Sequence, residues 1–487
     1  MKIEAKIEAI KKVLVANRGV SAFSILSTCK EMGIPTVAIF TAEDWDKPYL
    51  SLADEKYFIG EENGSGRSIY MNIDKIVTAG KETGCNFVHL GTGMGSENAE
   101  IVKAFDDAGI KNIGASHEKI KLASDKIEAI QLALKCGVPV KPGSHREVND
   151  VDDALAIAER IGYPVMLKPS RGGGGKGIKK FRTAEALKKG FATAKADIAR
   201  YCSGSRVYME KFYEKIYHIE IQVMGGYDKN GNYHVKIPGG RNCTIQREDQ
   251  KIVEEAPPPF ITKEKFLELK EAVIKIAESL QVIGVFTVEF VINCEDGKFY
   301  FSEINLRIQV EKGITEMIYR LNLIKLQILL ATGSFIDDIL KQDLISHGHA
   351  IEFRIYVERT DEKNRCFVPI EEEATIIEYS PPSGDGIEVD SGVCKGSTLT
   401  HHYDGLIALF KVWAETREKC IEKAYGGLKQ FKIKGKGVET NIDFHLKALE
   451  NYRFLRGDYD SDFVKEVLQG IHDQKRFDKM IENSNYD

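Results

Sequence analysis

The fold of this chain is decided by one stretch, Phe301-Ser302-Glu303-Ile304-Asn305-Leu306-Arg307-Ile308-Gln309-Val310-Glu311. Polar and apolar residues alternate strictly from Glu303 to Glu311. A period of two predicts a strand with one face in a core and the polar set on the other face. A solvated sheet face would give the same alternation. Two acids, two amides and an arginine in a row favour a functional face, because surface strands are richer in Thr, Lys and Ser.

A second strand is predicted just before this stretch, over residues 287–293. Glu295-Asp296-Gly297 between the two runs is typical of a three-residue hairpin loop. If Cys294 pairs with Lys298, counting back along both strands predicts that one acid of each strand faces the other.

These two acids are Glu289 and Glu303. Like charges on directly opposite strand positions repel, so the pair needs a counter-charge. Two carboxylates and the amide of Asn305 on one face favour a hard divalent cation, most simply Mg²⁺ carrying phosphates. A plain surface hairpin is the alternative. Residues 303–311 would span roughly 26 Å if fully extended, so we expect a bend after Arg307 that turns the far end toward a second reactant.

Composition excludes several classes of protein. The 487 residues predict about three domains, and 43% hydrophobic with 29% charged residues is typical of soluble globular proteins. A net charge of −5 argues against a nucleic-acid surface. Nine cysteines without a CxxC pair predict reduced thiols in a cytoplasmic protein. We find neither a signal peptide nor a membrane-spanning segment, so no membrane partner is expected.

The first hundred residues predict an open parallel sheet. The strand 12–16, the helix 21–32 and the strand 36–40 form a βαβ unit. Further strands are expected near 57–59, 86–89 and 111–113. The glycines of Gly91-Thr92-Gly93-Met94-Gly95 follow a strand end, where open α/β sheets bind ligands. A tight turn alone would also explain them.

A second glycine-rich stretch follows the predicted strand that ends at Lys168. Gly172-Gly173-Gly174-Gly175 would let backbone N–H groups approach phosphate oxygens, with Lys176 adding charge. It is not a GxxxxGK[ST] loop, and a flexible turn is the alternative. The polar run 241–251, taken alone, indicates a solvated strand and loop. Residues from about 348 onward predict a separate α/β unit.

Five features follow one another along the chain: the Lys126 helix, Lys168 with its glycine loop, Met209-Glu210-Lys211, His218-Ile219-Glu220 and the Glu303–Glu311 run. In this order they resemble the pattern of the biotin carboxylase family of ATP-grasp enzymes. The resemblance extends from Ala16 to Tyr459. It implies an α/β ATP-grasp fold in three domains. These are an N-terminal pre-ATP-grasp domain of open parallel α/β type (1–122), an ATP-grasp domain (123–345, with a mobile lid at about 140–222) and a C-terminal biotin-carboxylase domain of α+β type with a helical tail (346–487).

The resemblance also assigns roles by position. ATP would be held by Lys126, Lys168, Gly174, Gly175, Glu210, Lys211, His218 and Gln246. Mg²⁺ or Mn²⁺ would be held by Glu289, Glu303 and Asn305. Bicarbonate would be held by Lys251, Arg307, Gln309 and Val310, with Glu311 as the base that removes its proton and Arg354 on the ureido oxygen of biotin.

The reaction implied is ATP- and bicarbonate-dependent carboxylation of biotin through carboxyphosphate. Since the chain has no Ala-Met-Lys-Met segment, the biotin would be on a separate biotin carboxyl carrier protein, and a carboxyltransferase subunit would use it. Family members are commonly homodimers, although the changed helix from Ser21 to Ser27 departs from the usual interface.

Departures from the family pattern cluster around the carboxyl acceptor. Thr92 replaces a tyrosine, Asp249 a histidine, Lys312-Gly313 a His-Pro pair and Ser24 an arginine. These changes are compatible with drift in an ordinary biotin carboxylase, or with a ligase of the same chemistry that carboxylates another acceptor. A nucleotide-binding regulatory subunit without turnover is a third alternative. It has no reason to keep the base Glu311.

Overall fold

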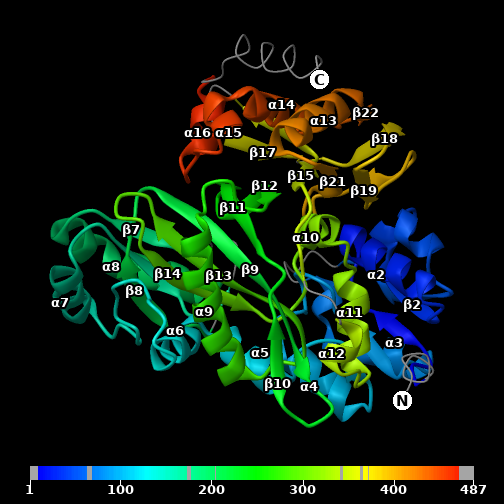
Figure 1. Cartoon of the computed structure of the whole chain (residues 1–487), viewed down its shortest axis with the longest axis horizontal. Coiled ribbons are helices and arrows are strands. Elements are labelled where there is room, and N and C mark those ends of the chain that lie inside the picture. Colours follow the sequence, from blue (N-terminus) through cyan, green and yellow to red (C-terminus); the bar gives the residue numbers. More distant parts are fainter. Residues whose placement is uncertain are drawn as a thin grey trace.

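The computed structural model describes residues 9–62, 68–172, 177–202, 204–340, 344–361, 366–370 and 372–470 (Figure 1). The N-terminal part lies at the right of the view, the strands of the large sheet cross the middle, and the C-terminal helices lie across the top. Gly174 and Gly175, which the sequence places at the phosphates, lie outside the described residues. No helix in the described part of the chain is long and apolar enough to cross a membrane.

The N-terminal part is the predicted open parallel sheet. Its strand order is β3-β2-β1-β4-β5, and every pair is parallel. Val13, Leu14 and Val15 are fully buried, as expected of a central strand covered on both faces. The elements are β1 (Val13–Val15), α2 (Gly19–Glu31), β2 (Thr36–Thr41), η1 (Ala42–Asp44), η2 (Pro48–Ser51), β3 (Glu55–Gly60), η3 (Ile69–Met71), α3 (Ile73–Glu82), β4 (Phe87–His89), α4 (Ala99–Asp107), β5 (Lys111–Asn112) and α5 (His117–Ala123).

A small antiparallel sheet with its own hydrophobic core forms the left edge of the molecule (Figure 1). Its strand order is β7-β6-β8, and two helices pack on it. The elements are α7 (Val151–Ile161), β6 (Val165–Pro169), β7 (Lys179–Phe181), α8 (Ala184–Tyr201) and β8 (Val207–Lys211). This layer falls within the predicted lid, whose motion stays a prediction.

A nine-stranded sheet forms the middle of the molecule, in the order β14-β13-β9-β11-β12-β15-β21-β19 with β10 beside β9. Because β12 pairs with β15, the sheet continues from the predicted ATP-grasp domain into the predicted C-terminal domain. The division into three domains stays a prediction. The elements are α6 (Lys126–Lys135), β9 (Ile216–Tyr227), β10 (Tyr233–Lys236), β11 (Gly240–Arg247), β12 (Gln250–Ala256), α9 (Lys263–Leu280), β13 (Gly284–Asn293), β14 (Phe299–Asn305), α10 (Lys312–Tyr319), α11 (Leu323–Ala331), α12 (Ile336–Ile339), β15 (His349–Tyr356), β19 (Ile387–Ser391) and β21 (Leu406–Ala414).

The C-terminal helices and two small sheets complete the fold. Helix α13 packs on β15 and β21, and its apolar face shares a core with the later helices. The elements are β16 (Glu358–Asp361), β17 (Cys366–Pro369), β18 (Ala374–Ser380), β20 (Thr398–Leu399), α13 (Arg417–Gln430), β22 (Lys432–Lys436), α14 (Ile442–Glu450), α15 (Tyr452–Arg456) and α16 (Phe463–Leu468).

The hairpin between β13 and β14 has a longer loop than predicted. The backbone N–H of Asn293 donates to the carbonyl of Lys298 at 2.9 Å, so Asn293 pairs with Lys298. The predicted pairing of Cys294 with Lys298 is therefore wrong. The N–H of Gly297 closes the loop by donating to the carbonyl of Asn293, also at 2.9 Å.

A β-bulge in β14 brings the two strands back into the predicted register. Ser302 is the extra residue, and beyond it Glu289 lies directly opposite Glu303. The pairing of the two acids is confirmed, although the loop that would have produced it is different. Strand β14 ends at Asn305, and the chain bends at Arg307, close to the predicted position just after that residue.

The polar run 241–251 is a solvated loop only at Glu248 and Asp249, which are exposed, and the prediction of a solvated strand is wrong. Arg241 is fully buried, and Asn242 and Thr244 are buried beside it on β11, a strand inside the sheet. Its polar groups are paired within the core. The guanidinium of Arg241 forms an ion pair with Glu220 and donates to Thr315 at 2.7 Å. Alternation and composition could not show this, because the partners lie on distant strands.

Glu255 joins the large sheet to the C-terminal helices, and its charge should matter for stability. Its carboxylate is buried and accepts hydrogen bonds from Arg417 Nε and His349 Nε2, both at 2.8 Å, and from Tyr459 Oη. Burial raises the pKa of Glu255, but Arg417 and His349 lower it by more, so that it falls from an ordinary 4.5 to about 2. The stabilisation is therefore present above pH 4.5 and is lost as the pH falls toward 2.

We expect Glu255→Gln to lower the free energy of unfolding by about 3 kcal/mol at pH 7, since each unit of pKa shift is worth about 1.4 kcal/mol. Urea unfolding of both proteins at several pH values measures the effect. The difference between variant and parent should shrink as the pH falls below 4.5. A difference that is the same at every pH would show that packing, not the charge, stabilises this junction.

Candidate active site

The three residues predicted to hold a divalent cation lie together at the edge of the large sheet. The amide of Asn305 donates to Glu289 Oε1 at 2.6 Å and to Glu303 Oε1 at 3.3 Å. Burial raises the pKa of Glu289, but Lys251 and His218 lower it by more, so this carboxylate is ionised. Two carboxylates in contact with one amide side chain are the residue types that suit a hard cation such as Mg²⁺ or Mn²⁺, and the assignment of the cation to them stays a prediction.

The predicted base, Glu311, is buried just before α10 and lies between two cations. Its Oε1 accepts from Lys251 Nζ at 2.7 Å, and its Oε2 accepts from Arg354 Nη2 at 2.9 Å. Burial raises the pKa of Glu311, but Lys251, Arg354 and Arg241 lower it well below its usual range. The carboxylate is therefore ionised at neutral pH, as a base must be.

Lys251 connects the base to the cation set. Its ammonium group donates to Glu220 Oε2 at 2.6 Å and to Glu289 Oε1 at 3.1 Å, besides its bond to Glu311. Arg354, which donates to the other carboxylate oxygen of Glu311, also donates from its Nε to Glu254 Oε1 at 2.7 Å. Glu220 and Glu254 were not among the predicted site residues. Glu254 stands in the sequence Glu254-Glu255-Ala256-Pro257, in which nothing indicates which of the two acids faces the arginine.

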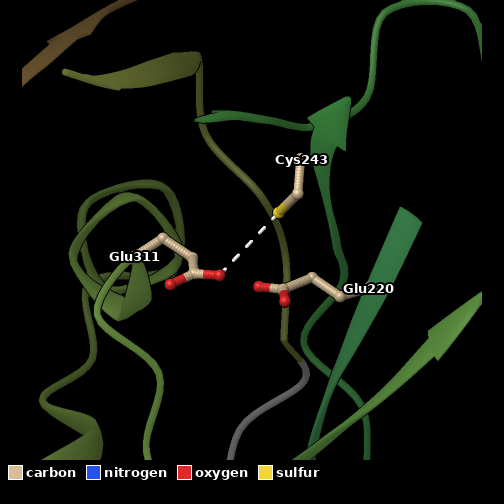
Figure 2. Close-up of side chains that lie close together, drawn as sticks. All are labelled: Glu220, Cys243 and Glu311. Carbon is tan, nitrogen blue, oxygen red and sulfur yellow. Dashed lines mark hydrogen bonds between the residues drawn. The ribbon is translucent and has the colours of Figure 1, made fainter. Parts of the chain in front are cut away.

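A thiol also faces the base. Figure 2 shows Cys243, Glu220 and Glu311 converging on one point, with Cys243 Sγ 3.9 Å from Glu311 Oε1. Such a group could hold a metal ion, but Lys251 and Arg241 already neutralise its carboxylates. Burial raises the pKa of the Cys243 thiol well above its usual range, so the thiol is protonated and donates weakly to the base.

Arg307 lies beside the base, and one of its N–H groups donates to no other group in the described part of the chain. Its Nη2 pairs with Glu97 Oε1 at 2.8 Å, and its Nη1 donates to Gln309 Oε1 at 3.1 Å. Its Nε is buried without a hydrogen-bond partner among the described residues. Gln309 in turn donates to Glu289 Oε1 at 3.3 Å, and half-buried Val310 precedes the base. A planar guanidinium with a vacant donor fits a planar anion such as bicarbonate.

Two cavities meet at this set of residues. The larger, of about 600 Å³, is lined by Lys126, Lys168, His218, Gln246 and Glu303 among others. The second, of about 490 Å³, is lined by Arg307 and Asn305, and it shares Lys126, Gly172 and Glu303 with the first. The shared residues bring a cavity large enough for a nucleotide and the guanidinium of Arg307 to the same carboxylate, Glu303.

Adjacent residues of β8 have different roles. Glu210 is buried and accepts from Nζ of Lys168, a lysine that lines the larger cavity, at 3.2 Å. Lys211 points the other way, and its Nζ donates to the carbonyls of Gly162 and Tyr163 at 3.1 and 2.6 Å. The side chain of Lys211 is not among those that line either cavity. Glu210 can act on a ligand in the cavity through Lys168, whereas nothing supports a role for the Lys211 ammonium group in binding ATP, and both assignments stay predictions.

His218 and Gln246 form a chain of polar contacts at the same wall. His218 Nδ1 accepts from Gln246 Nε2 at 2.9 Å, and its Nε2 contacts Glu289. Lys126 begins helix α6, and its Nζ lies 3.7 Å from Glu303 Oε2 and donates to the carbonyl of Gly172 at 2.9 Å. All three side chains line the larger cavity, and His218 and Lys126 also contact the carboxylates Glu289 and Glu303.

Asp249, which replaces a family histidine, lies in a tight hairpin turn. Arg247 pairs with Gln250, so Glu248 and Asp249 form a two-residue loop, with φ values of 46° and 63°. Both values are in the left-handed region, where aspartate and asparagine are among the residues best tolerated. The turn therefore explains why an aspartate is tolerated at this position.

The other departures contact one another. Thr92 donates its backbone N–H to Ser21 Oγ at 3.1 Å, and both are changed positions. Ser24, on the same helix as Ser21, donates to Asp390 Oδ2 at 3.0 Å. Asp390 also accepts from Lys411 Nζ at 3.1 Å.

Gly313 belongs to the same group of contacts. A Cβ atom at Gly313 would lie 2.4 Å from Cδ of Lys411, so only glycine leaves room for this lysine. Lys312 is buried beside it and pairs with Glu316 at 3.0 Å. Changes on α2 and after the base thus meet at one largely buried ion pair, Lys411 with Asp390.

Comparison with known proteins agrees with this geometry. Residues 9–120 match the family model described as biotin carboxylase, N-terminal domain. Residues 125–339 match the ATP-binding domain of the carbamoyl-phosphate synthase L chain, and residues 352–466 match the biotin carboxylase C-terminal domain. Biotin carboxylase 1 of Bacillus subtilis is 36% identical over 457 residues, which cover 94% of this chain and 98% of that protein. A pyruvate carboxylase subunit of Methanothermobacter thermautotrophicus is 37% identical over 96% of this chain and 91% of its own length.

Solved structures give the same result. The biotin carboxylase domain dimer of Hydrogenobacter thermophilus 2-oxoglutarate carboxylase, with MgADP, ADP and bicarbonate, has a TM-score of 0.86 and 34% identity over 94% of this chain and 98% of that one. The biotin carboxylase of Campylobacter jejuni in a β-γ-ATP complex has the same TM-score and identity over 93% of this chain and 98% of that one. The chain therefore belongs to the biotin carboxylase family of ATP-grasp enzymes.

Proposed function

We propose that this chain is an ATP-dependent ligase that carboxylates biotin on a separate carrier protein, with bicarbonate as the carbon source and carboxyphosphate as the intermediate. The observation that supports it best is the base. Glu311 is buried and ionised between Lys251 and Arg354, and it is close to an arginine with a vacant donor. No simpler nucleotide-binding role needs this arrangement.

The first step would be an attack on ATP. Arg307 and Gln309 orient bicarbonate, and Glu311 takes its proton as the bicarbonate oxygen forms a bond to the γ-phosphorus. The bond from that phosphorus to the ADP oxygen breaks, so ADP leaves and carboxyphosphate is formed. Lys168 stabilises the charge on the phosphates, and a divalent cation held by Glu289, Glu303 and Asn305 would neutralise further charge there.

The second step would release carbon dioxide beside the acceptor. Carboxyphosphate divides into carbon dioxide and phosphate, the phosphate takes the proton of the biotin nitrogen, and that nitrogen bonds to the carbon. Arg354 would bind the ureido oxygen as negative charge develops on it. Its present partners, Glu254 and Glu311, hold its guanidinium at the site.

The partners follow from the separate carrier. We propose a biotin carboxyl carrier protein and a carboxyltransferase subunit, in keeping with relatives that are named as subunits of pyruvate carboxylase. A homodimer is proposed from the dimer of the Hydrogenobacter thermophilus domain. A cytoplasmic location is proposed from the cysteines, none of which the structure joins in a disulfide within its described residues.

Phosphate release from MgATP tests the proposal. We expect release that depends on bicarbonate and that free biotin accelerates. Release that depends on bicarbonate but is indifferent to biotin would favour another acceptor, for which the grouped changes at Thr92, Ser24 and Gly313 are the specific observation. Nucleotide binding without any phosphate release, even with the carrier protein present, would contradict both ligase functions.

A further inference from the structure

A lysine that no prediction singled out lies in the nucleotide cavity. Lys141 lines the larger cavity together with Lys126 and Lys168. Its side chain is only 11% exposed. It lies on the short segment between α6 and α7, where the sequence Gly137-Val138-Pro139-Val140 gives no sign of a binding residue. A buried ammonium group in a cavity wall needs an explanation, because burying a charge is costly unless it is paired.

The pairing of Lys141 is incomplete. Its Nζ lies 2.6 Å from Glu210 Oε1, and Lys168 Nζ lies 3.2 Å from the same oxygen. One carboxylate thus serves two ammonium groups, and it can neutralise only one of them. Burial and the charge of Lys168 lower the pKa of Lys141, in spite of Glu210. The charge of Asp249 also acts on Lys141, but no ion pair joins the two in the described part of the chain, so an anionic ligand would balance the second ammonium group.

The backbone fixes Lys141 in place between two parts of the site. On one side the N–H of Phe301 in β14 donates to the carbonyl of Pro139 at 2.8 Å. On the other side the N–H of Lys211 in β8 donates to the carbonyl of Pro142 at 2.7 Å. The segment is therefore hydrogen-bonded both to β14, which carries the predicted cation ligands Glu303 and Asn305, and to β8, which carries Glu210. Lys141 lies between these two hydrogen bonds.

The same segment also packs closely against β8 at Gly143. A Cβ atom there would lie 2.5 Å from the backbone carbonyl of Met209, so the segment packs directly on β8. The position of Lys141 relative to Glu210 is thus set by main-chain contacts and does not depend on side-chain flexibility alone.

We infer that Lys141 is a further nucleotide-binding residue, whose ammonium group binds a phosphate oxygen of the nucleotide beside Lys168 while Glu210 positions both lysines. The inference rests on the nucleotide site of the proposed function and adds a residue to it. Phosphate is the part of the nucleotide that fits, because it supplies the negative charge that two lysines sharing one carboxylate lack. A nucleoside without phosphates would not engage Lys141.

Binding of ADP and of adenosine to the Lys141→Met variant tests this inference. The variant keeps the length of the side chain and leaves Glu210 paired with Lys168, so the fold should persist. We expect the dissociation constant for MgADP, measured by titration calorimetry, to rise about 10- to 100-fold, the usual range for a lost charge-assisted hydrogen bond. Adenosine binding should be unchanged, and Lys141→Arg should recover part of the ADP affinity.

A lysine elsewhere in the same layer provides the control. Lys195 on α8 donates to the carbonyl of Asn149 at 2.8 Å and does not line the cavity. Lys195→Met should bind MgADP like the parent. If Lys141→Met weakened adenosine and ADP equally, Lys141 would be a structural clamp, and unchanged ADP affinity would also overturn the inference. Failure of the proposed function is distinguishable, because it would appear in the parent protein as nucleotide binding without phosphate release, or as release that does not depend on bicarbonate.

Discussion

Replacing Glu311 by glutamine should reduce bicarbonate-dependent phosphate release by about 100- to 10,000-fold, the range usual for loss of a general base. Glutamine has the same shape and still accepts a hydrogen bond, but it cannot take a proton from bicarbonate. The ionised state of Glu311 is maintained by Lys251 and Arg354, both within 3 Å of its oxygens. The rate is measured as phosphate release from MgATP at saturating bicarbonate.

Two controls separate loss of the base from loss of the site. MgADP should bind Glu311→Gln with nearly the affinity of the parent, because Glu311 is not among the residues that line the nucleotide cavity. Glu388, a 58% exposed carboxylate on β19, should tolerate the same substitution without effect on the rate. A Glu311→Gln protein that kept a tenth or more of the parent rate would show that another group takes the proton.

Lys251→Met should destabilise the protein and abolish turnover. Lys251 is the one ammonium group shared by Glu220, Glu289 and Glu311 among the described residues, and it is buried with them. Removing one partner of a buried ion network typically costs about 3–5 kcal/mol, because the remaining charges are left uncompensated. Urea unfolding at pH 7 measures this loss directly.

The same substitution should also affect the base. Without Lys251 the pKa of Glu311 would rise, since that lysine is the strongest of the influences that lower it. Lys251→Arg keeps the charge and should recover most of the stability, while its bulkier planar head would restore the rate only in part. A loss of less than about 1 kcal/mol for Lys251→Met would contradict a central role of this lysine in compensating the three acids.

The cation set could be predicted from the sequence because it depends on local geometry. Strand alternation places Glu303 and Asn305 on one face, and a hairpin places Glu289 beside them. One detail of this prediction was wrong. The hairpin loop is longer than predicted, and a bulge at Ser302 restores the register that places Glu289 opposite Glu303. A bulge leaves little trace in a pattern of polar and apolar residues.

The buried network of charges around Glu311 could not be predicted from local alternation. Arg241 and Glu220 lie on β11 and β9, and their ion pair depends on which distant strands become neighbours. Polar residues in a strand normally indicate solvent, and here they indicate a buried network. Lys141 was missed for a similar reason. Its neighbours in the sequence are apolar, and only the packing of β8 against its segment reveals the shared carboxylate.

The central claim is that a bicarbonate oxygen attacks the γ-phosphate, and oxygen-isotope transfer tests it most directly. Bicarbonate fully labelled with oxygen-18 is mixed with the protein, MgATP and biotin, and the released phosphate is analysed by mass spectrometry before bicarbonate exchanges with water. The account predicts that each phosphate carries a single oxygen-18 atom, the one that joined carbon to phosphorus in carboxyphosphate. Phosphate without the label would show that water attacks ATP, and would contradict the account.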